Sequence, residues 1–143
     1  VIAMDVVEHA HDPGCALREI GRILQGGGLL LFSVPLHRRH WTRFDDLVGH
    51  HVRYEPSEIL EILQGLGLSV LRSAPFGILP GSRWLVRIGA FFLARLRGPA
   101  VWFEDRIVLP LAHRFQKPLR WSPGFVEDEG ADGVILWCEK RSL

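Results

Sequence analysis

The sequence predicts an α/β fold built on two parallel strands that are joined by a helix. Residues 1–7 are apolar and β-branched, as expected for a strand that is buried on both faces. A helix is predicted from Pro13 to the glycines at 26–28, and a second apolar, buried strand follows over residues 29–34. Because the connections between these elements are short, we expect a βαβ unit with its two strands parallel.

The first helix is delimited by residues that favour helix ends. Asp12 is a typical N-cap, and Pro13 fits the first helical turn. The glycines at 26–28 can adopt the left-handed conformation that ends helices. Apolar residues three or four positions apart form one face of this helix: Ala16, Leu17, Ile20 and Leu24.

A polar loop and a second helix are predicted in the middle of the chain. The loop covers residues 36–54 and carries four of the seven histidines. The helix begins at Pro56 and ends at Gly67, with an apolar face that includes Ile59 and Leu63. Further strands are predicted over residues 68–72 and 133–140, and the last of these closes the chain.

Residues 76–125 interrupt this alternation, and we expect them to form a helical insertion before the last strand. Within them, residues 83–97 carry four arginines and no acid, with apolar residues at helical spacing. Pro110 interrupts a second apolar segment over residues 101–115. Three interpretations remain open, namely helices that cover the core, a peripheral membrane contact through residues 83–97, and a lid over an apolar substrate.

The composition restricts the class of protein. The chain has 143 residues, which is typical of one domain, and 48% of them are hydrophobic, which excludes a mainly disordered chain. A formal charge of +1 argues against a nucleic-acid partner. Cys15 and Cys138 are far apart and form no metal-binding or disulfide pattern, which favours a reducing cytoplasm.

Four ordered segments resemble class I S-adenosylmethionine-dependent methyltransferases. They are residues 5–13 (DVVEHAHDP), 17–28 (LREIGRILQGGG), 32–35 (FSVP) and 49–58 (GHHVRYEPSE). The resemblance covers residues 1–73 and, more loosely, the last strand. It implies one partial methyltransferase domain over residues 1–143, with a doubly wound Rossmann-like sheet. This chain would supply the fourth to seventh strands of that sheet, the last of them antiparallel.

The resemblance also implies that the N-terminal half of the domain is missing. The family's glycine-rich turn and the acidic residue that holds the cofactor ribose lie before the matched segments. We therefore expect the isolated chain to be inactive and to have no measurable affinity for S-adenosylmethionine. We also expect the apolar edge formed by residues 1–7 to cause dimerisation or aggregation.

Candidate cofactor and catalytic residues follow the first strand. Ligands of open α/β sheets bind beyond the carboxyl ends of the strands. The resemblance implies that the backbone of Met4, Asp5 and Val6 lines the methionine part of S-adenosylmethionine. His9 has the side chain of a general base for a hydroxyl acceptor. Glu8 and His9 can instead cap or orient the following segment.

The histidine-rich segments contain candidate substrate-binding and metal-binding residues. Arg38, Trp41 and Arg43 can pair with and stack on an anionic acceptor, or they belong to a flexible lid. We expect no metal. The alternative is a divalent cation held by Asp5, Glu8, His9 and His50, because two metal-containing branches of the family carry a similar pattern.

The function implied by the resemblance is methyl transfer from S-adenosylmethionine to a small acceptor, which the apolar insertion suggests is hydrophobic. One alternative is an RNA or sugar O-methyltransferase. The other is a non-catalytic remnant that serves as an interaction module.

Overall fold

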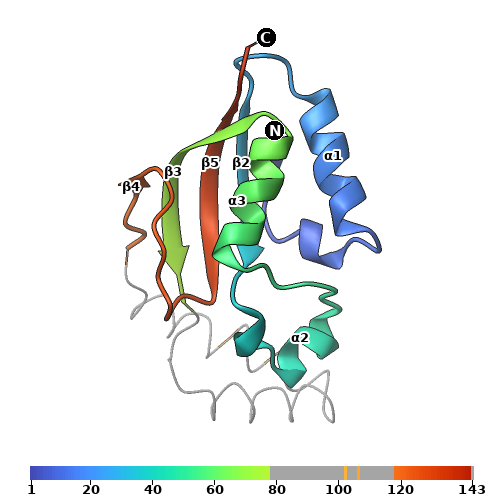
Figure 1. Ribbon diagram of the computed structural model, residues 1–143. Helices are drawn as coiled ribbons and strands as arrows, with labels where there is room; N and C mark the ends of the chain where they lie inside the picture. The colour runs from blue at the N-terminus through green and yellow to red at the C-terminus, as the bar shows by residue number, and fades with distance from the viewer. Residues whose placement is uncertain (78–101, 103–105, 107–117, 143) are drawn as a thin grey trace. The chain divides into compact units, whose positions relative to one another are not determined.

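The computed structural model describes residues 1–77, 102, 106 and 118–142. The chain divides into two compact units. The first combines residues 1–41, 50–77 and 119–143, and the second combines residues 42–49 and 78–118. The first unit contains the sheet (Figure 1).

Five strands of the described residues form one open sheet in the order β1-β2-β5-β3-β4 (Figure 1). β1 is parallel to β2, with Ile2 opposite Leu31, whereas β5 is antiparallel to both β2 and β3. The parallel pair and the antiparallel last strand confirm the α/β class and the partial Rossmann-like sheet predicted from the sequence. The strands are β1 (Ile2–Ala3), β2 (Leu29–Pro35), β3 (Leu68–Phe76), β4 (Ser122–Pro123) and β5 (Gly133–Lys140).

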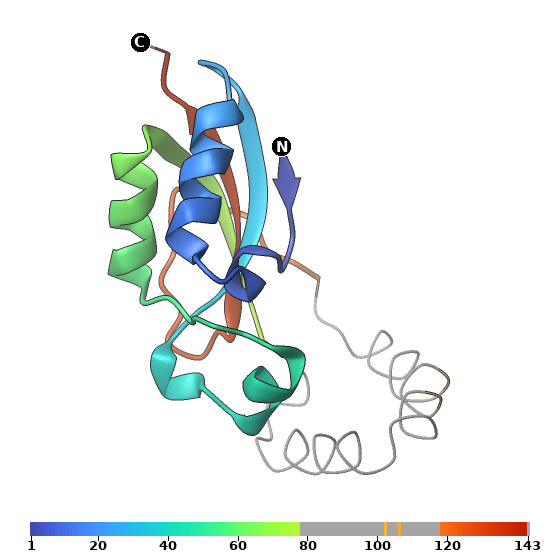
Figure 2. The ribbon, with the colours of Figure 1, turned by 90° about the vertical axis from the view of Figure 1, so that its right-hand side faces the viewer.

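Two helices, α1 (Pro13–Ile23) and α3 (Pro56–Gly65), lie on the same side of the sheet (Figure 2). Asp12 caps α1 as predicted, since its Oδ1 accepts a hydrogen bond of 2.8 Å from the Cys15 amide. Glu58 in the first turn of α3 accepts a bond from the Glu55 amide at 3.4 Å. Gly67, with a φ of 71°, adopts the left-handed conformation just beyond the end of α3.

The hydrophobic core lies between the two helices and the sheet. Leu30, Phe32 and Val34 alternate along β2 and are fully buried, whereas Leu29 is exposed. Ser33 and Pro35, which alternate with them on the opposite face, are buried as well, so the second half of β2 is buried on both faces, as expected from the sequence. The same core contains Leu17 and Leu24 of α1, Ile59 and Leu63 of α3, and Val134, Leu136 and Cys138 of β5.

The first strand is much shorter than the predicted residues 1–7. β1 ends at Ala3, and a 3-10 helix, η1, covers Val7–His9. The backbone turns at Asp5, which has a φ of 49° that no strand can contain. Ile2 is 74% exposed at the sheet edge. The apolar character of residues 1–7 was thus a correct indication of a strand but not of its length.

The polar segment 36–54 contains helices that the sequence analysis assigned to a loop. The 3-10 helix η2 covers Arg38–His40, and α2 covers Arg43–Val48 within the second unit. Thr42 caps α2, because its Oγ1 accepts a bond of 3.3 Å from the Phe44 amide, and Asp45 accepts one of 2.7 Å from the Thr42 amide. This capping box is a local sequence pattern that could have indicated the helix start.

The predicted helical insertion falls mainly outside the described residues. At its ends, β3 extends to Phe76 rather than ending at residue 72, and β4 occupies Ser122–Pro123. The helices expected over residues 83–97 and 101–115 lie outside the described residues, apart from Trp102 and Arg106. Among the helices that the structure describes, none has both the length and the apolar character needed to cross a membrane.

Candidate functional site

The sheet topology brings several loops to one edge. β1, β2 and β3 run in the same direction because β5 is antiparallel to both β2 and β3. Their carboxyl ends and the start of β5 therefore lie at the same edge of the sheet. This edge carries residues 4–9, 36–41 and 127–132, together with the segment around Tyr54, which forms a parallel bridge with Leu36. Ligands of open α/β sheets bind at such an edge.

The turn after β1 is held by a hydroxyl of the neighbouring strand. Ser33, which is buried on β2, accepts a hydrogen bond of 2.8 Å from the Asp5 amide and donates one of 2.7 Å to Asp5 Oδ1. These two bonds stabilise the left-handed backbone of Asp5, a conformation that aspartate tolerates better than most residues. Met4, Asp5 and Val6 are exposed, so the predicted cofactor-binding residues form an accessible, fixed turn.

The role of Ser33 was not predicted from the sequence. Its only visible sign was a single polar residue inside the apolar segment 29–34. A buried hydroxyl in a strand needs a hydrogen-bond partner. Ser33 finds this partner in the turn at Asp5.

A second group of side chains lies directly after this turn. Glu8, His9 and His50 place ligand atoms within 4.8 Å of one another, and the His9 and His50 rings contact edge to face with centroids 4.8 Å apart. His51 holds the two segments together, because its amide donates a bond of 2.7 Å to the Glu8 carbonyl. The fourth member of the predicted set, Asp5, lies outside this group and bonds to Ser33.

The carboxyl group of Glu8 is buried, which is unusual for an acidic side chain. It is 1% exposed, and its Oε2 has no hydrogen-bond partner among the residues that the structure describes. Burial raises the pKa of the Glu8 carboxyl above its usual range, and the Asp5 carboxylate adds to this effect, whereas His50 and His9 oppose it. A buried oxygen without a partner is costly, which marks Glu8 as a candidate functional group.

Tyr54 carries another buried polar atom near this group. Its hydroxyl has no hydrogen-bond partner within the described part of the chain. Burial raises the pKa of Tyr54 to about 12, with smaller contributions from the Glu58 and Glu8 carboxylates. Tyr54 therefore remains protonated at neutral pH and can donate a hydrogen bond.

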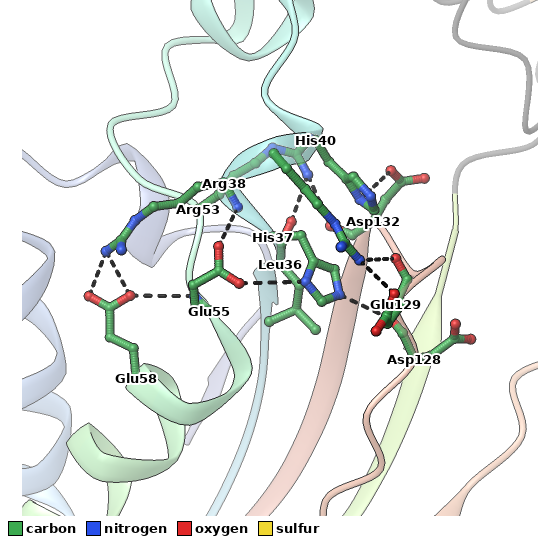
Figure 3. Close-up of polar contacts among 11 residues, drawn as sticks. Leu36, His37, Arg38, His40, Arg53, Glu55, Glu58, Asp128, Glu129 and Asp132 are labelled. Atoms are coloured by element: carbon green, nitrogen blue, oxygen red, sulfur yellow. Dashed lines mark hydrogen bonds and ion pairs between the residues drawn. The ribbon is translucent and has the colours of Figure 1, made fainter.

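Polar contacts fix the segment that follows β2 (Figure 3). The buried Arg53 donates from Nη1 to the carbonyl oxygens of Leu36 and Asp132, at 3.1 Å each. Arg38 donates from Nη2 to both carboxylate oxygens of Glu58, at 2.8 and 2.7 Å. The chain segments before β5 and before α3 are thereby joined to the loop after β2.

His37 completes this network. It is buried, with a φ of 58°, and its Nε2 lies 3.0 Å from the Asp128 carbonyl oxygen. Its Nδ1 lies 3.6 Å from Glu55 Oε2, and Glu55 Oε1 accepts a bond of 2.9 Å from the Arg38 amide (Figure 3). These contacts join the residues after β2 to the segments before β5 and α3.

The structure places two of the three predicted substrate residues at one pocket. Arg38 and Trp41 line it together with His51, Val52 and Arg53. Arg43 lies on α2 in the second unit and is not among the residues that line this pocket.

No protein-family model and no curated protein matches the chain. Among solved structures, it is similar to a S-adenosylmethionine-dependent methyltransferase of Thermotoga maritima, described as a possible histamine N-methyltransferase, with 14% identity and a TM-score of 0.56 over 98% of this chain. It is also similar to the cyclase SpnF, with 20% identity and a TM-score of 0.49 over 98% of this chain. The chain spans about half the length of these two proteins, 54% and 48%.

The likeness to the Thermotoga protein establishes the fold. The described residues have a class I methyltransferase-like, partial Rossmann fold, in agreement with the resemblance seen in the sequence.

Proposed function

We propose that this chain is the second half of a class I S-adenosylmethionine-dependent methyltransferase domain that acts on a small molecule. The observation that carries the proposal is the exposed Met4–Val6 turn, which Ser33 fixes at the ligand-binding edge of a methyltransferase-like sheet. His9 lies three residues after Val6, beside His50, and is the proposed proton acceptor for the substrate.

In the proposed reaction, the backbone of residues 4–6 lines the methionine part of the cofactor. The sulfonium of S-adenosylmethionine supplies an activated methyl group, so the protein mainly aligns the acceptor and excludes water. His9 takes the proton of a hydroxyl acceptor, and its contact with the His50 ring fixes the orientation of the imidazole.

Two observations support the half-domain part of the proposal. The chain spans 54% of the length of the Thermotoga methyltransferase. Among the strands that the structure describes, β1 pairs with β2 alone, and Val1 and Ile2 are exposed at the edge of the sheet. An apolar strand edge with unpaired backbone groups is a position where further strands add to a sheet.

Cofactor binding tests this proposal. We expect the protein produced from the complete gene to bind S-adenosylmethionine in calorimetry, whereas residues 1–143 alone give no measurable heat. In the complete protein, Val6→Arg should weaken binding by at least about tenfold, equivalent to about 1.4 kcal/mol, because the long side chain obstructs the exposed turn. Leu71→Arg is the matched control, since Leu71 is also exposed but lies on β3.

The outcomes separate the alternatives. A complete protein that does not bind the cofactor supports the non-catalytic interaction module and contradicts the enzyme. A gene that encodes no polypeptide before Val1 contradicts the half-domain. Transfer of labelled methyl groups to RNA or sugars, rather than to the small-molecule fraction, decides for those acceptors.

A second candidate function is a divalent-cation site formed by Glu8, His9 and His50, which we call the catalytic corner. One carboxylate and two imidazoles suit Zn²⁺ or a related ion, and the unsatisfied Glu8 Oε2 is an oxygen that a cation can satisfy. A bound cation polarises an acceptor oxygen as a Lewis acid.

Zinc titration of the chain checks this candidate. We expect Glu8→Gln to weaken Zn²⁺ binding at least about tenfold, because the amide is a poor ligand compared with a carboxylate. Glu61→Gln, on the exposed face of α3, should leave the affinity unchanged. Equal affinities of the chain and the Glu8→Gln variant would exclude this site.

A further inference from the structure

The pocket beside the candidate catalytic corner has a distinct chemical character. Its volume is about 350 Å³, and it is lined by Arg38, Trp41, His51, Val52 and Arg53. This volume lies within the range of roughly 300–1,000 Å³ found for small-molecule sites. The lining contains two guanidinium groups, two further ring systems and no carboxylate. Such a wall favours a ligand that is both planar and negatively charged.

The two arginines are held in place before any ligand arrives. Arg53 is buried and bonded to the backbone carbonyls of Leu36 and Asp132. Arg38 uses Nη2 for Glu58, while Nε and Nη1 make no hydrogen bond to the described residues (Figure 3). Because Glu58 already fixes this guanidinium, a ligand loses less side-chain entropy when it bonds to the remaining donors.

Trp41 supplies the aromatic part of the wall. Its side chain is half-exposed, and it follows directly after η2, so its position depends on the same fixed segment. An indole ring next to guanidinium groups can stack on an aromatic ligand while the arginines bond to its anionic group.

The pocket borders the candidate catalytic residues through His51. The His51 amide bonds to the carbonyl of Glu8, which is adjacent to His9, and His51 itself lines the pocket. A ligand in the pocket therefore lies next to the corner that contains His9 and His50.

From these observations we propose that the pocket binds a planar aromatic ring that carries an anionic group, a carboxylate or a phosphate. Its role as the methyl-acceptor site rests on the proposed function, whereas the binding itself does not. Arg38 recognises the anionic group with its Nε and Nη1 donors, and Trp41 stacks on the ring.

The test measures binding of aromatic anions to the 143-residue chain without any cofactor. The probes are 2-naphthoate and 2-naphthyl phosphate, with the methyl ester of 2-naphthoate as a neutral ring and cyclohexanecarboxylate as an anion without an aromatic ring. We expect at least one of the two aromatic anions to shift the backbone amide resonances of residues 38, 41 and 51–53 in NMR spectra. The two control probes should bind at least about tenfold more weakly, and the tighter aromatic anion identifies the anionic group.

Matched variants keep the proposal falsifiable. Arg38→Gln and Trp41→Ala should each weaken binding about fivefold to tenfold. Arg39→Gln and Trp137→Phe should leave binding unchanged, because neither residue lines the pocket. A circular dichroism spectrum identical to that of the parent chain shows that each variant is folded.

Two results would overturn the proposal. One is equal binding of the neutral ester, and the other is a lack of resonance shifts with both aromatic anions. If the 143-residue chain binds these probes but the complete protein has no affinity for S-adenosylmethionine, the pocket is retained and the methyltransferase is refuted.

Discussion

Phe32→Ala is expected to lower the free energy of unfolding by about 3–5 kcal/mol. Among the residues that the structure describes, Phe32 has the largest fully buried side chain, and it lies in the middle of β2, opposite Ala3 on β1 and Leu136 on β5. Truncation to alanine removes contacts between Phe32 and the core residues of the helices and leaves a cavity that the surrounding side chains fill only in part. Because small domains are stable by only about 5–15 kcal/mol, the variant should unfold at a much lower urea concentration.

Leu71→Ala is the control for this experiment. Leu71 is a large apolar residue in a strand, but it is exposed at the register irregularity between Val70 and Arg72. We expect its loss of stability to stay below about 1 kcal/mol. Equal losses for Leu71→Ala and Phe32→Ala would contradict the core described for this sheet.

Elements with local signals were predicted well from the sequence. Asp12 and Pro13 identified the start of α1, Pro56 the start of α3, and the bounds of β5 agree with the predicted strand at 133–140. In each case, the residues that determine the element lie within it or next to it. Propensity and capping are properties of such short segments, so one sequence is sufficient.

Two strand ends that depend on distant residues were not predicted. The end of β1 depends on the bonds of Asp5 to Ser33, which is 28 positions away in sequence. The extension of β3 to Phe76 depends on pairing with Gly133. Hydrophobic pattern cannot show either contact, because both arise only when the sheet assembles.

In the candidate site, too, residue types could be recognised from the sequence, whereas contacts between distant residues could not. Glu8, His9 and His50 were singled out because the residue types alone indicate acid–base or ligand chemistry, and the structure brings them together. Arg38 was considered as a substrate contact or as part of a flexible lid, and its ion pair with Glu58 was not predicted. The bonds of Arg53 to the carbonyl oxygens of Leu36 and Asp132 join segments that are far apart in sequence, so they could not be predicted either.

Ser33→Ala should affect both stability and the proposed cofactor site. The change removes an acceptor from the Asp5 amide and a donor from Asp5 Oδ1. We expect the free energy of unfolding to fall by about 1–3 kcal/mol, which is typical when a partly buried donor loses its partner. Urea denaturation of the chain measures this loss, and amide hydrogen exchange at Asp5 should become faster in the variant.

The matched control is Ser57→Ala on the exposed surface of α3, where we expect a change within about 0.5 kcal/mol. The two variants also separate the structural role of Ser33 from the proposed function. If the turn at Asp5 lines the cofactor, Ser33→Ala in the complete protein weakens S-adenosylmethionine binding, because the left-handed backbone of Asp5 is no longer stabilised. Unchanged cofactor affinity together with faster exchange at Asp5 would show that this turn is structural and that the cofactor contacts other residues.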